Sequence, residues 1–380
     1  MRKASSRRIF GVVALIVAFA AVNASANHDD DNRSPILPQL TAAPTFSDST
    51  VPANGDVNPY GVAFVPSGFP RGGPLRPGDI IVSNFNNAAN LQGTGTTIVR
   101  VNNDASPTPF FQGETGIGLS TALGVLKGGF VLVGNLPSTD GSGTCTAEGG
   151  PTQNVGQGGV LVIDQHGQMV EQLTSASLLN GPWDMTVKDE GQRAQVFVAN
   201  ALSGTVTRLN LRIAGGQGKG HRLVVESETQ IASGYVHRCD PAAFVVGPTG
   251  LALDGRTDTL YVSSTGDNAI FAVANASRRR SDAGMGKVVV QDQTHLHGPL
   301  GLVLTGNGDF ISTQGDAVNP DPNQVSEVVE FTHSGQFVAE FSVDSAAGSA
   351  FGIALKQFDG GFTFATVDDT TAVLDVWVVK

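Results

Sequence analysis

Short apolar runs separated by turn-forming residues recur along this chain. The stretch TLYVSSTGDNAIFAV, residues 259–273, contains two such runs, and the six residues between them, 263–268, are turn formers. This pattern predicts two β-strands joined in a hairpin. Because two strands alone are barely stable, the hairpin must belong to a larger repeated object.

A repeat search supports that expectation. Six segments share a glycine that opens an apolar strand, with Asp184 replacing the glycine in the third: NPYGVAFV, STALGVLK, GPWDMTVK, GPTGLALD, GPLGLVLT and SAFGIALK. Successive copies are 63, 60, 66, 51 and 51 residues apart, and each is followed by a second and a third strand. Six units of about four strands predict an all-β, six-bladed β-propeller over residues 58–380. The alternative, a β-sandwich with chance similarities, does not explain why the segments share the same order of glycine, first strand and second strand.

Blade six lacks an outer strand before the chain stops at Lys380. An open ring would expose a strand edge, so we expect the segment APTFSDSTV, residues 43–51, to fill the gap. The polar, proline-containing stretch 27–40 before it is predicted to be a flexible leader. In the alternative interpretation, all of residues 27–57 are disordered.

The composition fits this fold, and the N-terminal residues predict the cellular compartment. Glycine is frequent, at 48 residues, and charged residues make up only 15%. Residues 1–26 combine a basic start, a 14-residue apolar run and a small-x-small ending, which predicts a signal peptide cleaved after Ala26. The alternative is an uncleaved anchor. The segment SRRIF also resembles a twin-arginine export signal. We expect a bacterial-type periplasmic or secreted protein with no membrane span after cleavage.

The charge excludes one class of partner. The chain carries 23 basic and 34 acidic residues, and cleavage after Ala26 leaves 19 basic residues and a net charge of −15. Nucleic-acid binding needs basic patches, and the only basic cluster, SRRRS at 277–281, fits a solvated loop. We expect a monomer.

The expected binding face is the end of the ring where the first strands begin and the second strands end. Residues before the glycine positions include the aromatic side chains Tyr60, Trp183 and Phe351, with Asp184 one position further on. The second strands end in polar residues, among them Asn84, Asn135, Asn200 and Asp368. An aromatic floor with a polar rim suits a small organic ligand, a glycan or a peptide. In the alternative interpretation, the aromatic residues plug the channel and the asparagines cap turns.

Long loops and cysteines point to the same face. The loops after the second strand are long in blades one, two and five, and such loops often carry binding function. The two cysteines, Cys145 and Cys239, fall in top-face connections. In an exported protein two cysteines usually pair, so we expect a disulfide between them rather than two free thiols.

The segment GPTGLALDGRTDTLYVSSTGDNAIFAV resembles an NHL repeat, and VFVANALSGTVTRL resembles the repeat of YncE-like propellers. The resemblance covers residues 58–380 and implies the fold, but it does not specify function. A more distant resemblance to regucalcin/gluconolactonase-type propellers would imply a divalent metal held by Glu, Asn and Asp at the channel mouth. The matching positions here hold no carboxylate, and Asp184 lies one residue away.

The sequence gives little support for a zinc or calcium site. Only His297 precedes a first strand, so no three-histidine zinc site is expected. The loop GDAVNPDPN, with Asp316 and Asp321, has oxygen ligands for Ca²⁺ but lacks the spacing of a calcium loop. We therefore expect no cofactor, and a binding or scaffold module for a small organic ligand, glycan, peptide or protein. The alternative is a metal-dependent hydrolase or lyase using Asp184, Asp368 or His297.

Overall fold

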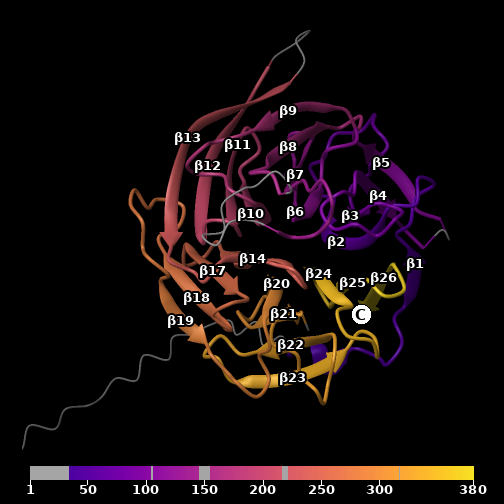
Figure 1. The fold of residues 1–380 in the computed structure, drawn as a ribbon, viewed down its shortest axis with the longest axis vertical. Helices are drawn as coiled ribbons and strands as arrows, with labels where there is room; N and C mark the ends of the chain where they lie inside the picture. Colours follow the sequence, from indigo (N-terminus) through magenta and orange to yellow (C-terminus); the bar gives the residue numbers. More distant parts are fainter. Residues whose placement is uncertain (1–33, 104–105, 145–154, 216–220, 316) are drawn as a thin grey trace, which may run out of the picture. The chain divides into compact units, whose positions relative to one another are not determined.

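The computed structural model describes residues 34–380 except 104–105, 145–154, 216–220 and 316. Six four-stranded antiparallel sheets are arranged around a central channel, which confirms the predicted six-bladed propeller (Figure 1). In blades one to five the strands follow chain order from the channel outward, whereas the outermost strand of blade six comes from the N-terminal part of the chain, as the colours of Figure 1 show. Among the described residues, no helix is long and apolar enough to cross a membrane.

The predicted first, second and third strands all form. Blade one holds β2 (Val57–Phe64), β3 (Ile80–Asn86), β4 (Thr97–Val101) and β5 (Thr108–Gln112); blade two holds β6 (Leu119–Leu126), β7 (Phe130–Asn135), β8 (Gly159–Asp164) and β9 (Met169–Leu173). Blade three holds β10 (Pro182–Asp189), β11 (Arg193–Asn200), β12 (Thr205–Ala214) and β13 (Arg222–Ser233); blade four holds β16 (Pro248–Asp254), β17 (Thr259–Ser264), β18 (Ala269–Ala274) and β19 (Lys287–Val290). Blade five holds β20 (Pro299–Leu304), β21 (Phe310–Gln314), β22 (Glu327–Phe331) and β23 (Phe337–Ser342); blade six holds β24 (Ala350–Phe358), β25 (Gly361–Asp368) and β26 (Val373–Val379).

The N-terminal segment closes the ring. Strand β1 (Phe46–Ser49) pairs antiparallel with β26, in register from Phe46 opposite Val376 to Ser49 opposite Val373. It is the outer strand of blade six, and it lies within the predicted segment 43–51. Pairing with β1 hides the outer edge of β26 from other chains.

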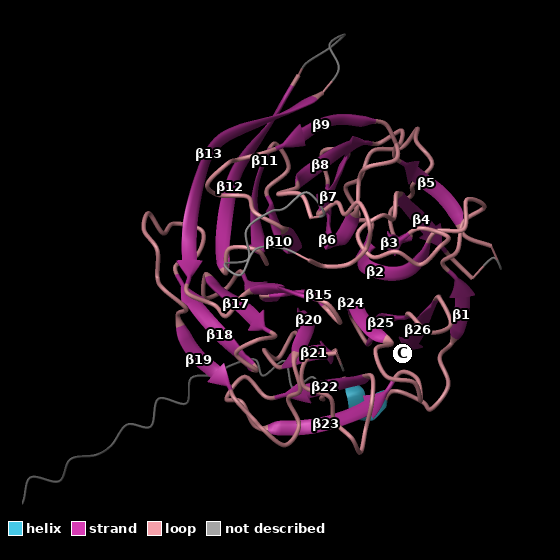
Figure 2. Ribbon diagram, in the orientation of Figure 1, coloured by secondary structure: helices cyan, strands magenta, loops and turns pink. Residues whose placement is uncertain are grey.

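The leader differs from its prediction beyond residue 34. Ile36 and Leu37 are buried beside blades five and six, and a 3₁₀ turn, η1 (Leu37–Gln39), follows (Figure 2). The buried carboxylate of Glu330 accepts hydrogen bonds from the backbone N–H groups of Ile36 at 3.0 Å and Leu37 at 2.8 Å. The sequence suggested a flexible stretch because polar residues dominate it, but the pair Ile-Leu supplies enough apolar surface to dock.

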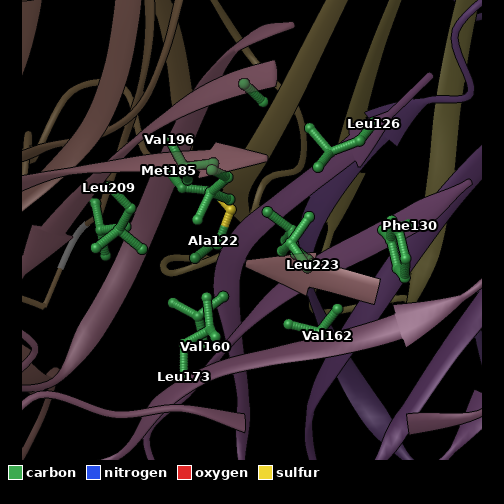
Figure 3. Close-up of a cluster of buried hydrophobic side chains, with 14 of the residues drawn as sticks. Ala122, Leu126, Phe130, Val160, Val162, Leu173, Met185, Val196, Leu209 and Leu223 are labelled. Atoms are coloured by element: carbon green, nitrogen blue, oxygen red, sulfur yellow. The ribbon is translucent and has the colours of Figure 1, made fainter. Parts of the chain in front are cut away.

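Blades pack face to face through apolar layers. Between blades two and three, Leu126 and Phe130 belong to one buried cluster with Val196 and Leu209 (Figure 3). Such layers exclude water from both faces of a blade, and they explain why the strands read as continuous apolar runs instead of alternating patterns. The blades therefore form a rigid frame around the channel.

The repeated glycine and a β-bulge shape the channel. Every first strand shifts register against its second strand near its start, as at Pro59/Gly61 and Pro182/Asp184. A bulge re-aims the side chain that it carries. The glycine is required by close approach: a Cβ on Gly352 would lie 1.8 Å from the carbonyl oxygen of Tyr60 in the next blade.

One element was not predicted. Strands β14 (Arg238–Asp240) and β15 (Phe244–Val246) form a hairpin between blades three and four, and β14 crosses near the centre of the ring in Figure 1. Each strand has only three residues, and the prediction treated the segment as a connection. The basic stretch 277–281 lies between strands, as expected of a loop.

Candidate functional site

A cavity of about 180 Å³ lies at the predicted binding face. Its wall comes from blades one, three, four, five and six and from the β14–β15 hairpin, and includes Tyr60, Trp183, Leu300, Phe351 and Asp369. These residues lie at the starts of first strands or just after second strands. Two of the three long loops, after β3 and after β21, also contribute through Gln92 and Val318. The topology therefore brings residues far apart in sequence to one cavity.

Five aromatic rings form a buried cluster at the cavity, and Tyr60, Trp183 and Phe351 among them line it. Tyr60 stacks between Phe85, with centroids 4.9 Å apart, and Phe351, with centroids 4.3 Å apart. Trp183 meets Tyr60 edge-on at 5.6 Å and lies 6.4 Å from Phe244 of the hairpin. The three predicted aromatic residues are therefore in one cluster. Phe85 and Phe244 belong to it as well, although neither was singled out from the sequence.

This cluster largely closes the channel, as the alternative interpretation expected. Tyr60 is only 7% exposed and Trp183 only 2%. Because Phe85 and Phe351 both stack on Tyr60, that side chain offers little surface to the cavity. Phe351 is half-buried and is the aromatic side chain that offers the most surface to a ligand. The aromatic residues thus form a floor over a plugged channel.

Two polar groups on the cavity wall have no hydrogen-bond partner among the described residues. The side-chain oxygen of Asn58 is buried and unpaired, and Asn58 has a left-handed backbone conformation, with φ of 59°. The half-buried carboxylate of Asp369 makes no side-chain hydrogen bond with a described residue, although its backbone N–H donates to Ser349 at 2.9 Å. Unpaired buried polar groups are costly, so such groups at a cavity are expected where a ligand supplies the partner.

The electrostatics of the cavity follow from burial. Burial, with a smaller contribution from the charge of Asp368, raises the pKa of Asp369 to about 7. Burial also raises the pKa of Tyr60 above its ordinary value, and the charge of Asp369 adds to that shift. The Tyr60 hydroxyl and the Asp369 carboxyl therefore lie close enough to interact. Perturbed groups in a cavity are typical of functional sites.

The predicted rim asparagines lie inside the blades and do not line the cavity. The side-chain amide of Asn84 donates to the carbonyl of Thr50 at 3.0 Å, and the side-chain oxygen of Asn135 accepts from the N–H of Gly118 at 2.8 Å. Asn200 accepts from the N–H of Asn180 at 3.1 Å. These side chains fasten the ends of second strands to neighbouring loops, which is a common role for asparagine.

The two predicted carboxylates have different positions. Asp368 is buried in the turn after β25, where it accepts from the hydroxyl of Thr371 at 2.6 Å, while its neighbour Asp369 reaches the cavity. Asp184 lies on the wall of a second cavity, of about 460 Å³, formed by the first strands of all six blades. Burial raises the pKa of Asp184 well above its ordinary value, while hydrogen bonds from the N–H groups of Met185 and Leu251 oppose that shift.

The cysteine and calcium predictions fall partly outside the described residues. Cys239 lies on β14 beside the aromatic cluster, and no described cysteine is free. Its expected partner Cys145 is not described, so the pairing stays a prediction. Asp316 is likewise not described. Asp321 accepts from the N–H of Asn323 at 2.7 Å and lies 3.8 Å from Nε2 of His297. Among the described residues, no group of three or more His, Cys, Asp or Glu side chains could hold a metal ion.

No protein-family profile and no curated protein sequence matches the chain. Solved structures with a similar arrangement include a gluconolactonase from Xanthomonas campestris, which is 14% identical, with a TM-score of 0.49 over 89% of this chain and 97% of that one. They also include regucalcin, a calcium-binding protein from Agrobacterium tumefaciens, which is 13% identical, with a TM-score of 0.49 over 90% of this chain and 97% of that one. At these identities the matches assign no activity to this protein, and the NHL and YncE resemblances stay predictions.

Proposed function

We propose that this protein is a binding module for a small organic ligand, held in the cavity between Tyr60, Phe351 and Asp369. One observation carries the proposal. An aromatic floor and the carboxylate of Asp369, which has no side-chain hydrogen-bond partner among the described residues, line one cavity. Binding sites typically combine an apolar wall with a few polar groups that fix orientation. A glycan or peptide would have to place a single small group in a space of about 180 Å³.

The proposal is tested by blocking the cavity without disturbing the core. Ala242 is exposed and lines the cavity from the hairpin, so Ala242→Trp should cover the opening while the fold stays intact. Ligands that bind only the native state raise the melting temperature by mass action. We expect compounds from a small-molecule set to raise the melting temperature of the wild type and not that of Ala242→Trp. Equal rises in both proteins would contradict binding at this cavity.

The alternative, a metal-dependent hydrolase or lyase, has one observation in its favour. Asp184 is a carboxylate in the larger channel cavity and replaces a repeated glycine there. Thermal scans with EDTA and then with Ca²⁺, Mg²⁺, Mn²⁺ and Zn²⁺ added singly distinguish the two functions. A metal-dependent rise in melting temperature that Asp184→Asn removes would favour the enzyme. No rise with any ion is expected from the binding module.

We further propose that the protein acts outside the cytoplasm after cleavage behind Ala26. The support is the pattern of residues 1–26, with its basic start, apolar run and small-x-small ending. Mass measurement of the protein exported by a bacterial host should give a chain that begins at Asn27. Recovery of the full-length chain, with Met1 in place, would contradict this proposal.

A further inference from the structure

The polar groups of the cavity share one property, which is that they accept hydrogen bonds. Asp369 carries the only charge among the described residues of the wall, and the uncharged polar side chains of Asn58, Tyr60, Gln92 and Thr265 can each accept as well as donate. Among the described residues that line the cavity, none is Lys, Arg or His. An anionic ligand would find no positive side chain there and would be repelled by Asp369. The wall therefore matches a ligand that donates hydrogen bonds or carries positive charge.

The size of the cavity and its apolar wall further restrict the ligands that can fit. An apolar cavity of about 150 Å³ can hold benzene, so a space of about 180 Å³ admits a molecule of roughly eight to ten non-hydrogen atoms. One face of Phe351 is stacked on Tyr60, and Phe351 also lines the cavity. Aromatic rings attract cations, and a carboxylate beside a ring strengthens that preference. The net charge of −11 favours the approach of a cation.

We propose that the ligand is a small organic cation, an ammonium group on an apolar body, with its charged end held by Asp369 and its body against Phe351. This rests on the proposed function, because it assigns a ligand class to the same cavity. A single carboxylate with aromatic neighbours suits an ammonium group better than a hard metal ion, which prefers six or more oxygen ligands.

Isothermal titration calorimetry with three probes of similar size tests the preference for a positive charge. Benzylamine is cationic at pH 8, benzyl alcohol has the same shape without the charge, and phenylacetate supplies a negative charge. We expect benzylamine to bind the wild type at least about ten-fold more tightly than benzyl alcohol, since a charged hydrogen bond exceeds a neutral one by about that factor. Phenylacetate should bind most weakly of the three.

Substitutions show which side chain produces the preference for benzylamine over benzyl alcohol. Asp369→Asn should abolish the preference for benzylamine over benzyl alcohol. Asp359→Asn is the matched control, because Asp359 is an exposed aspartate in the β24–β25 turn of the same blade and is not part of the cavity wall. It should keep the full preference. Melting curves of each variant verify folding.

The pH dependence of the preference for benzylamine is an independent test. Two titratable groups interact with the Asp369 carboxyl. The charge of Asp368 raises the pKa of Asp369, and the charge of Asp369 in turn raises the pKa of Tyr60. Asp369 is ionised at pH 8 and largely protonated at pH 5.5, so the benzylamine preference should fall several-fold at the lower pH in the wild type. The Asp369→Asn variant should show no such change.

The outcomes separate the ligand class from the proposed function. Equal affinities for benzylamine and benzyl alcohol, both lost in Ala242→Trp, would overturn the cation and leave the binding cavity in place. A preference that survives in Asp369→Asn would also overturn this inference. Failure of the wild type to bind any probe at millimolar concentration would contradict both proposals. Displacement of benzylamine by Ca²⁺ at equal concentration would identify a metal site instead.

Discussion

The rings of Tyr60 and Phe351 stack with 4.3 Å between their centroids and 26° between their planes. Tyr60 opens blade one and Phe351 opens blade six, so this contact joins the first and last blades of the ring. Both residues also line the candidate cavity. The contact between the first and last blades and the candidate site therefore share these two side chains.

Close approach of these blades makes Gly352 intolerant of substitution. In Gly352→Ala the new Cβ would lie 1.8 Å from the Tyr60 carbonyl oxygen, and backbone atoms would have to move. We expect a loss of about 3 kcal/mol in the free energy of unfolding, measured by urea denaturation. Gly255→Ala is the control, because nothing lies within 4 Å of its Cβ position. Equal losses in the two variants would contradict close inter-strand approach as the reason for the glycine.

The N-terminal segment is predicted to stabilise the propeller through Glu330. Glu330→Ala leaves the N–H groups of Ile36 and Leu37 without their partner, which should cost about 2 kcal/mol in the free energy of unfolding. In a chain that begins at residue 41 the same substitution should cost nothing, because both partners are already absent. A double-mutant cycle by urea denaturation measures this coupling. Additive costs would show that Glu330 acts through other contacts.

The raised pKa of Asp369 predicts a pH-dependent stability. The folded pKa of about 7 exceeds the ordinary value of 3.8, so folding favours the protonated form. Stability from this group is full below about pH 4 and is lost as the pH rises toward 7. Asp369→Asn removes that loss, so it should stabilise the protein at pH 8 by on the order of 2 kcal/mol, after allowance for solvent screening.

At pH 4 the same substitution should leave stability nearly unchanged. Melting temperatures of the wild type, Asp369→Asn and the exposed Asp359→Asn control across this range provide the check. A stabilisation by Asp369→Asn that is as large at pH 4 as at pH 8 would exclude charge burial as its cause.

The predicted disulfide between Cys145 and Cys239 should stabilise the binding face. Cross-linking residues so far apart in sequence contributes about 4 kcal/mol in the chain-entropy model, less any strain. Cys145→Ser should therefore lower the melting temperature, and reductant should lower that of the wild type to the same value. Peptide mass mapping of the non-reduced protein checks the pairing directly. A thiol-reactive label on both cysteines of the native oxidised protein would refute it.

The fold was predictable because its signals repeat. Five of the six blades reuse a glycine at the same point of the first strand, and the close approach seen at Gly352 supplies the physical reason. The ring-closing strand was predictable from the missing outer strand of blade six. The docking of Ile36 and Leu37 was not, because two apolar residues in a polar stretch do not reveal their partner.

The site was only partly predictable. Tyr60, Trp183 and Phe351 were found because their position relative to the repeated glycine fixes their height in the ring. Asp369 was missed because the second-strand end suggested its neighbour Asp368, which instead caps a turn. The signal that identifies Asp369 is one further residue into the loop, where a side chain is free to turn toward the axis.

Phe244 and Asn58 could not be identified in the same way. Phe244 belongs to the β14–β15 hairpin, which lies outside the repeat and so has no counterpart in other blades. The role of Asn58 depends on a left-handed backbone conformation and a missing partner, neither of which is visible in the sequence.

A crystal structure of the protein with its tightest-binding compound from the melting-temperature screen tests the central claim most directly. The account predicts the compound in the cavity, in contact with Phe351 and within hydrogen-bond distance of the Asp369 carboxylate. A compound bound in the channel against Asp184, or on the outer surface of the blades, would contradict it.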